Sequence, residues 1–404
     1  MSVLVITRTR HICGVLYYLS RRRLPSQKSD ITSLERKAHL IQQLKMCQAF
    51  SATGADVQFV SPGTATPPWD FVSAYYGLST EFDLKAARTP SVNYNFPNYP
   101  IPDADDLAVT FWLFYMVLSR GFDPGDVVYS RNLTPTRQLL RALDWTNLGN
   151  DISVWFEQHQ VDRGAGARFY DRLDGVVCIS ERQEQRLHKN SPVDEGKTFV
   201  AHDGVDLDAY RGISTEAARS RLGIDRNELI VMYTGHLYPS KGVETLVRAA
   251  ASFDANCYIV GGNPEDISRI KVETEIPDTV TFTGFVPPAK IPLYQMSADV
   301  LVATVADDTG AREFFSPLKI FEYMAAGKPL VVSRKPAYEE VLADGWNGLF
   351  VDPGSVPALA EAIEQLLSDP ALRREFGRQA HSDAARYGWT VRARRILNEI
   401  AARV

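Results

Sequence analysis

Two charged residues, Lys319 and Glu322, interrupt the otherwise apolar stretch "SPLKIFEYMAAGKPLVVS" at residues 316–333. Side chains three residues apart share one face of a helix. Ser316 can cap such a helix, and Pro317 suits its first position because no hydrogen bond is lost there. The helix start attracts anions, so Lys319 would strengthen a phosphate site, and Glu322 offers acceptor oxygens to hydroxyl groups behind it. This pattern fits a nucleotide diphosphate with its ribose, although the stretch taken alone slightly favours a buried helix with one Lys–Glu pair.

A second stretch, "YTGHLYPSKGVETLV" at residues 233–247, favours the phosphate interpretation. It follows a predicted strand and opens a predicted helix. Gly235 allows a ligand to approach the backbone closely, and Lys241 with Gly242 stands at the helix start. The glycine spacing is not that of a P-loop. Together with residues 316–322, the loop places two positive helix starts near one sheet edge, which predicts an anion site there.

The elements that position these residues are those of an α/β protein. Short β-branched runs alternate with helical patterns nearly throughout, as in parallel sheets. The predicted strands are 15–19, 57–60, 127–130, 152–156, 175–179, 197–201, 229–234, 257–260, 280–283, 300–304, 330–333 and 349–351. The predicted helices are 37–52, 105–119, 134–144, 181–189, 242–253, 288–296, 317–326, 336–343, 355–368, 370–386 and 390–404. "MSVLVIT" at residues 1–7 is also strand-like, so either it or 15–19 opens the first sheet.

The length of 404 residues predicts two domains. We place them at residues 1–204 and 205–389, with the helix at 390–404 able to return to the first domain. The Gly- and Asp-rich segment 202–215 is expected to act as the hinge. Ligands of doubly wound sheets bind at the carboxyl ends of the strands, so the site should lie there.

Composition excludes several classes of protein. A hydrophobic share of 45%, a charged share of 23% and a net charge of -5 indicate a soluble globular protein that does not bind nucleic acid. The cysteines have no paired or zinc-type spacing, which predicts free thiols in a reducing, cytoplasmic environment; they are Cys13, Cys47, Cys178 and Cys257. The apolar run 107–118 is too short to span a bilayer and is predicted to be a buried helix. Arginines at 8, 10 and 21–23 allow at most peripheral membrane contact.

The chain resembles the retaining GT-B glycosyltransferases of family 4 (glycosyl transferases group 1). The specific matches lie in the second half, at residues 233–246, 280–302 and 316–333. Looser matches in the first half lie at residues 37–62, 126–132, 154–159, 178–181 and 202–207. The resemblance implies the GT-B fold, with two doubly wound Rossmann-like domains facing across a cleft. It further implies hexosyl transfer from a UDP- or GDP-type sugar donor to an acceptor hydroxyl, with retention of configuration and without metal or cofactor.

The resemblance also implies roles for individual residues of the second domain. Lys241 contacts the donor diphosphate and takes part in catalysis, and Glu322 binds the ribose hydroxyls. The segment "GFV" at 284–286 contacts the base. The remaining implied donor residues are Gly235, His236, Phe285, Val286, Ser316, Pro317, Leu318 and Lys319.

Two departures from the family pattern concern the same site. The first glutamate of the paired motif is expected at Phe314, so Glu313 is the candidate to replace it in catalysis. His236 stands where many members carry an arginine, which removes one permanent charge. These departures leave a nucleotide-sugar epimerase or hydrolase, or a non-catalytic nucleotide-sugar-binding pseudo-enzyme, as alternatives.

In the first domain, His159 matches the family histidine near the transferred sugar and acceptor. The stretch "SVNYNFPNYP" at 91–100 alternates aromatic and amide residues, which suits sugar binding as well as a Pro-rich surface loop. Tyr94, Phe96 and Tyr99 are its candidate acceptor contacts. "DAD" at 103–105 reads as helix-capping acids rather than a metal site. The acceptor, whether sugar, lipid or small molecule, is not specified by these features.

Overall fold

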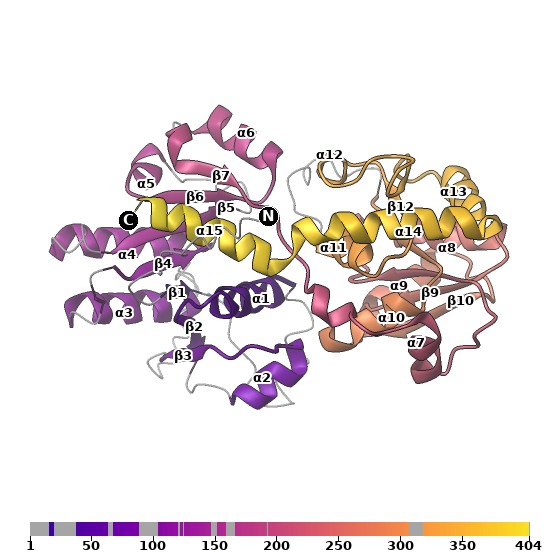
Figure 1. Ribbon diagram of the computed structural model, residues 1–404, viewed down its shortest axis with the longest axis horizontal. Helices are drawn as coiled ribbons and strands as arrows, with labels where there is room; N and C mark the ends of the chain where they lie inside the picture. Colours follow the sequence, from indigo (N-terminus) through magenta and orange to yellow (C-terminus); the bar gives the residue numbers. More distant parts are fainter. Residues whose placement is uncertain are drawn as a thin grey trace, which may run out of the picture. The chain divides into compact units, whose positions relative to one another are not determined.

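The chain folds into two compact units. The computed structural model describes residues 16–19, 38–63, 68–88, 104–119, 122–123, 125–146, 152–158, 166–191, 193–306 and 318–403. Unit 1 comprises Met1–Ala74, Leu78–His202 and Trp389–Val404, and unit 2 comprises Tyr75–Gly77 and Asp203–Gly388. Figure 1 shows their elements coloured along the sequence.

Unit 1 is built on a parallel sheet. Within the described residues it has seven strands in the order β3-β2-β1-β4-β5-β6-β7. They are β1 (Leu16–Leu19), β2 (Val57–Gly63), β3 (Asp83–Arg88), β4 (Val127–Ser130), β5 (Ser153–Gln158), β6 (Gly175–Cys178) and β7 (Thr198–Val200). The strand order reverses at β1, which pairs with both β2 and β4. The predicted strand 15–19 is therefore confirmed as β1, whereas residues 1–7 lie outside the described residues.

The helices of the first half are α1 (Ala38–Ala52), α2 (Trp69–Tyr76), α3 (Ala104–Leu118), α4 (Leu133–Thr146), α5 (Ala167–Asp171) and α6 (Glu181–Asn190). The helix α15 (Trp389–Arg403) joins them and packs on α1. In Figure 1 this yellow helix lies among the indigo and magenta elements of unit 1.

Unit 2 repeats the architecture. Its described strands form a six-stranded parallel sheet in the order β10-β9-β8-β11-β12-β13. They are β8 (Ile230–Thr234), β9 (Asn256–Val260), β10 (Val280–Gly284), β11 (Val300–Ala303), β12 (Leu330–Ser333) and β13 (Leu349–Val351). The helices are α7 (Thr215–Leu222), α8 (Val243–Ala249), α9 (Pro264–Glu273), α10 (Ile291–Ser297), α11 (Leu318–Ala325), α12 (Pro336–Glu339), α13 (Val356–Ser368) and α14 (Pro370–Ala384).

Both faces of the unit 2 sheet are covered. Along β8, Val231 and Tyr233 belong to one apolar cluster, while Ile230 and Met232 belong to the other. Successive side chains of a strand point to opposite faces, so each cluster fills one side of the sheet. This explains why the strands read as continuous apolar runs, and the α/β prediction is confirmed.

The apolar helix at 107–118 is only partly buried, so that prediction is wrong for one face of α3. Leu113 and Val117 are buried in the core of unit 1, but Phe111, Tyr115 and Leu118 are 59%, 67% and 60% exposed. Residues spaced by four and three share one helix face, and here that face points to solvent. No helix in the described part of the chain is long and apolar enough to cross a membrane.

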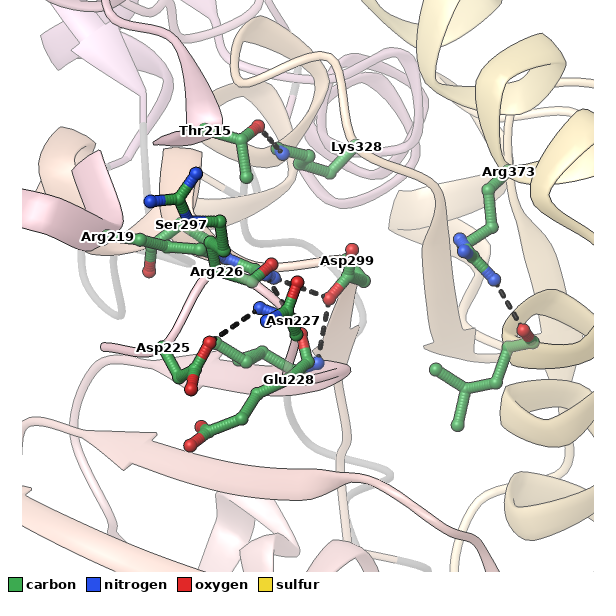
Figure 2. Close-up of polar contacts among 12 residues, drawn as sticks. Thr215, Arg219, Asp225, Arg226, Asn227, Glu228, Ser297, Asp299, Lys328 and Arg373 are labelled. Carbon is green, nitrogen blue, oxygen red and sulfur yellow. Dashed lines mark hydrogen bonds and ion pairs between the residues drawn. The ribbon is translucent and has the colours of Figure 1, made fainter. Parts of the chain in front are cut away.

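The predicted hinge segment is well ordered where it enters unit 2. A 3-10 turn at Leu207–Tyr210 buries Tyr210, and α7 begins at Thr215. On α7, the buried Arg219 donates from Nε to the carbonyl of Ser297 (2.9 Å) and pairs with Asp299 (2.6 Å; Figure 2). Asp299 also accepts from the backbone N–H of Ile230 at 2.8 Å, which ties α7 to the start of β8.

Lys328, in the turn between α11 and β12, joins this cluster from the other side. Its Nζ donates to the hydroxyl of Thr215 at 2.7 Å (Figure 2). Burial lowers the pKa of Lys328 to about 8, and the nearby Arg219 charge adds to this, while Asp299 acts in the opposite direction. Gly327, at φ +64°, is the left-handed residue that ends α11.

Unit 1 contains a buried charged cluster of its own. Glu157 on β5 pairs with Arg131 (3.4 Å) and with Arg392 of α15 (3.2 Å), and accepts from the Tyr129 hydroxyl at 2.6 Å. Arg392 also donates to the carbonyl of Ala201 at 3.2 Å. The helix α15 is therefore fixed to unit 1 by a buried ion pair as well as by apolar packing.

The predicted free thiols are confirmed at the three described positions, since Cys47, Cys178 and Cys257 are buried and unpaired with one another. Burial raises the pKa of Cys257 to about 12. Cys13 lies outside the described residues.

Candidate functional site

The candidate site begins at the carboxyl end of β8. Gly235, at φ +133°, donates its N–H to the carbonyl of Val260 at 2.8 Å. A Cβ on Gly235 would lie 3.2 Å from Nζ of Lys319, and a Cβ on Gly261 would lie 2.4 Å from the Gly235 carbonyl oxygen. A Cβ on Gly261 would therefore clash with the Gly235 backbone, whereas one on Gly235 would crowd only the end of the Lys319 side chain. The ends of β8 and β9 and the start of α11 lie close together.

Lys241 follows on the same loop. It ends a 3-10 turn at Pro239–Lys241, and its carbonyl accepts from the Thr304 hydroxyl at 2.8 Å. Gly242 comes next at φ +59°, where a Cβ would lie 2.6 Å from the carbonyl carbon of Val305. The loop is therefore pressed against the chain that leaves β11, which holds the Lys241 backbone at the carboxyl edge of the sheet.

Lys319, the second residue of α11, brings a second positive charge to this edge. Its Nζ lies 3.5 Å from the ring centre of Tyr233, a cation–π contact. Burial, and then the charge of Lys241, hold the pKa of Lys319 well below its usual range, while Glu322 acts in the opposite direction. No ion pair to Lys319 is found among the residues that the structure describes. Two lysines that disfavour each other's charge make this edge a site for an anion.

His236 follows Gly235 in the same loop. Its ring stacks on Tyr238 with centroids 5.0 Å apart and an interplanar angle of 11°. Burial, Lys319 and Lys241 lower its pKa, so the ring is neutral at pH 7. His236 therefore does not replace the positive charge of the arginine found at this place in many family members.

Glu322 stands one turn after Lys319 on α11. Its Oε2 accepts from Nε2 of Gln295 at 3.1 Å. The same amide donates to the Thr234 hydroxyl at 3.1 Å and accepts from the Tyr210 hydroxyl at 2.6 Å. Sequence reasoning did not identify Gln295, Thr234 or Tyr210 as part of the site.

The predicted base-contacting segment lies at the same edge. Gly284, at φ +69°, accepts from the N–H of Gly261 at 3.0 Å. Phe285, which follows it, is 37% exposed, whereas Val286 is buried. An exposed aromatic ring next to two glycines offers a flat apolar surface to a planar ligand.

Most of the described donor-site residues that were predicted lie together at the carboxyl edge of the unit 2 sheet: Gly235, His236, Lys241, Leu318, Lys319 and Glu322. Phe285 and Val286 lie at the same edge, because Gly284 before them bonds to Gly261. Several predicted residues lie outside the described residues: Tyr94, Phe96, Tyr99, His159, Glu313, Phe314, Ser316 and Pro317. The strand β5 ends at Gln158, the residue before His159. The roles assigned to all these residues stay predictions.

The candidate site lies within the part of the chain that matches a known protein family. The family model described as "Glycosyl transferases group 1" matches residues 214–383. The D-inositol 3-phosphate glycosyltransferase 2 of Catenulispora acidiphila is 27% identical over 242 residues, which cover 55% of this chain and 55% of that protein. The chain therefore spans little more than half the length of this curated relative.

Solved structures resemble almost the whole chain. A glycosyltransferase from Rickettsia africae covers 96% of this chain, and 98% of that chain is matched, with a TM-score of 0.69 at 17% identity. The structure of Anabaena Alr3699/HepE in complex with UDP-glucose matches 97% of this chain over 100% of its own chain, with a TM-score of 0.68 at 16% identity. At these identities the likeness concerns the fold, and the predicted GT-B fold is confirmed.

Proposed function

The chain belongs, through residues 214–383, to the Glycosyl transferases group 1 family, and on this premise we propose that it is a retaining hexosyltransferase. The proposed reaction moves a sugar from a nucleotide-diphosphate-sugar to an acceptor hydroxyl without a metal ion. A UDP-type donor is favoured over a GDP-type donor because a structural neighbour binds UDP-glucose.

The observation that carries the proposal is the pair of lysines at the carboxyl edge of the unit 2 sheet. Lys319 has no carboxylate partner among the described residues and sits beside the open backbone of Gly235. Burial and the charge of Lys241 lower its pKa, and a bound anion would favour the charged form. A diphosphate is an anion of the required charge, and the bare glycine backbone allows its oxygens to approach.

The same groups suit the chemistry of the leaving group. As the bond between the anomeric carbon and the phosphate oxygen breaks, negative charge builds on the diphosphate. Lys241 and Lys319 would stabilise that charge, as preorganised charges do in other enzymes. Glu322, one turn behind, offers carboxylate oxygens to the ribose hydroxyls.

We assign residues of both domains to the sugar and the acceptor. His159 would contact the transferred sugar, and Glu313 would hold its hydroxyls in place of the glutamate expected at Phe314. Tyr94, Phe96 and Tyr99 are the proposed acceptor contacts. The names of the relatives point to a polyol phosphate as one acceptor to test.

The test is a panel of UDP- and GDP-sugars incubated with the protein without acceptor, with release of nucleotide and free sugar followed by chromatography and the anomeric configuration by NMR. Slow hydrolysis of one donor with retention supports the proposal. His159→Ala should abolish this turnover and leave nucleotide binding intact. Intact turnover in His159→Ala would show that this residue has been wrongly assigned.

The same panel, repeated with candidate acceptors, separates the alternatives, because a hydrolase would release free sugar but form no glycoside. An epimerase would convert the donor into a second nucleotide-sugar without releasing the nucleotide. A pseudo-enzyme would bind a nucleoside diphosphate but turn over no donor, with or without candidate acceptors. Absence of any nucleoside diphosphate binding would refute the proposed function itself.

A further inference from the structure

Gln295, on α10, occupies a position from which one side chain reaches both halves of the candidate site. It is fully buried. Its Nε2 donates to Oε2 of Glu322 and to the hydroxyl of Thr234, both at 3.1 Å. Glu322 is the proposed ribose residue, and Thr234 is the last residue of β8, directly before Gly235. One amide therefore joins α11 to the start of the phosphate loop.

The orientation of this amide follows from its partners. The Glu322 carboxylate can only accept, so the NH₂ group of Gln295 must face it. The amide oxygen then faces Tyr210, whose hydroxyl donates to it at 2.6 Å. Burial and the nearby Glu322 charge raise the pKa of Tyr210 well above its usual range, so the phenol keeps the proton that it donates.

Tyr210 is itself firmly held. It lies in the 3-10 turn Leu207–Tyr210 by which the chain enters unit 2, and its side chain is buried in the unit 2 core. A few residues on, Arg219 bonds to the carbonyl of Ser297 and to Asp299, so the entering segment is also fixed to the end of α10. Tyr210 is therefore held both by its burial in the unit 2 core and by the bonds of Arg219. Through Gln295 it connects to Glu322 at the site.

We propose that Gln295 is a positioning residue that sets the Glu322 carboxylate for the ribose hydroxyls, and that Tyr210 fixes Gln295 in that orientation. The proposal rests on the proposed nucleotide-sugar function. In this proposal the buried network of Tyr210, Gln295 and Glu322 recognises the ribose diol, whereas Lys241 and Lys319 bind the diphosphate. A charge-assisted hydrogen bond to a carboxylate that must also bind a ligand carries a large share of the affinity for that ligand.

The test compares two probes, the better-binding of UDP and GDP and its 2′,3′-dideoxy analogue, by isothermal titration calorimetry. Gln295→Leu should raise the Kd for the ribonucleotide about tenfold, because Glu322 loses the hydrogen bond from Nε2 of Gln295. The Kd for the dideoxy analogue should change less than about twofold, since that analogue lacks the hydroxyls on which Glu322 acts. Gln365→Leu, at an exposed glutamine of α13, is the matched control and should leave both constants unchanged.

Tyr210→Phe keeps the buried ring and removes only the donated hydroxyl, so it tests the second half of the proposal even if Gln295→Leu folds poorly. It should raise the ribonucleotide Kd about threefold with the same dependence on the ribose. An equal loss of affinity for both nucleotides, or no loss in a folded variant, would overturn the proposal. Wild-type protein that binds neither UDP nor GDP would instead refute the proposed function.

Discussion

Lys328 offers a quantitative test of how unit 2 is stabilised. Its ammonium lies in the cluster of Thr215, Arg219 and Asp299 (Figure 2), and burial lowers its pKa from 10.5 to about 8. At about 1.4 kcal/mol per pKa unit, keeping this charge in the folded state costs about 3 kcal/mol. Lys328→Met keeps most of the side chain, removes the charge and gives up the hydrogen bond to Thr215, a loss of about 1 kcal/mol.

The sign of the effect depends on pH. Below pH 8 both the folded and the unfolded protein carry the Lys328 proton, so the full cost is present and Lys328→Met should be about 2 kcal/mol more stable at pH 7. Between the two pKa values the unfolded state holds more protons, so wild-type stability rises with pH relative to the variant. Near pH 10 the advantage of Lys328→Met should have almost disappeared.

The assay is urea unfolding followed by circular dichroism at pH 7 and pH 10 for wild type and variant, so that other titrating groups cancel in the difference. Lys290→Met, at an exposed lysine of the same unit, controls for the loss of a surface charge. A destabilised Lys328→Met variant whose deficit is the same at both pH values would refute the reasoning. In that case the folded protein would hold the charged lysine without penalty.

Three further predictions concern the candidate site. Gly242→Ala should lower the free energy of unfolding by about 2 kcal/mol or more, because its Cβ meets backbone 2.6 Å away at φ +59°. Gly223→Ala, at φ +71° with open space around it, should cost only about 1 kcal/mol in the same urea titration. Glu322→Ala should raise the calorimetric Kd for UDP or GDP about tenfold, and unchanged affinity would refute the ribose role. Since burial lowers the pKa of Lys319, diphosphate affinity should fall as pH rises through that pKa, and Lys319→Met should bind weakly without this pH dependence.

The strands of both sheets were predictable because buried parallel strands carry a strong local signal. Predicted and observed strands differ by at most a few residues at their ends: β8 starts one residue later than predicted, and β12 has its predicted bounds. The strand β3 was not predicted, because its sequence "DLKAAR" has no apolar run. Among the described strands it is at the sheet edge and pairs with β2 alone, so it needs no such run. The helix α9 was missed despite a local signal, since Asn263 caps it by accepting from the N–H of Asp266 and Pro264 opens it.

Only those site residues that stand close together in the sequence could be predicted. Lys319 and Glu322 share a helix face, and Lys241 lies in a glycine-bounded loop, so both patterns are visible in short stretches. Gln295 gave no such signal, because its partners lie 85, 61 and 27 residues away in the sequence. Only the order of strands in the folded sheet brings them together.

The return of α15 to unit 1 has a consequence for synthesis on the ribosome. Residues 203–388 emerge before the last segment of unit 1, which begins at Trp389, and Arg392 leaves the tunnel only after them. Until then the nascent unit 1 lacks the ion pair between Arg392 and Glu157 and the helix that packs on α1. Unit 2 needs no segment from beyond Gly388, so unit 1 is the unit that stays open to chaperones until α15 arrives.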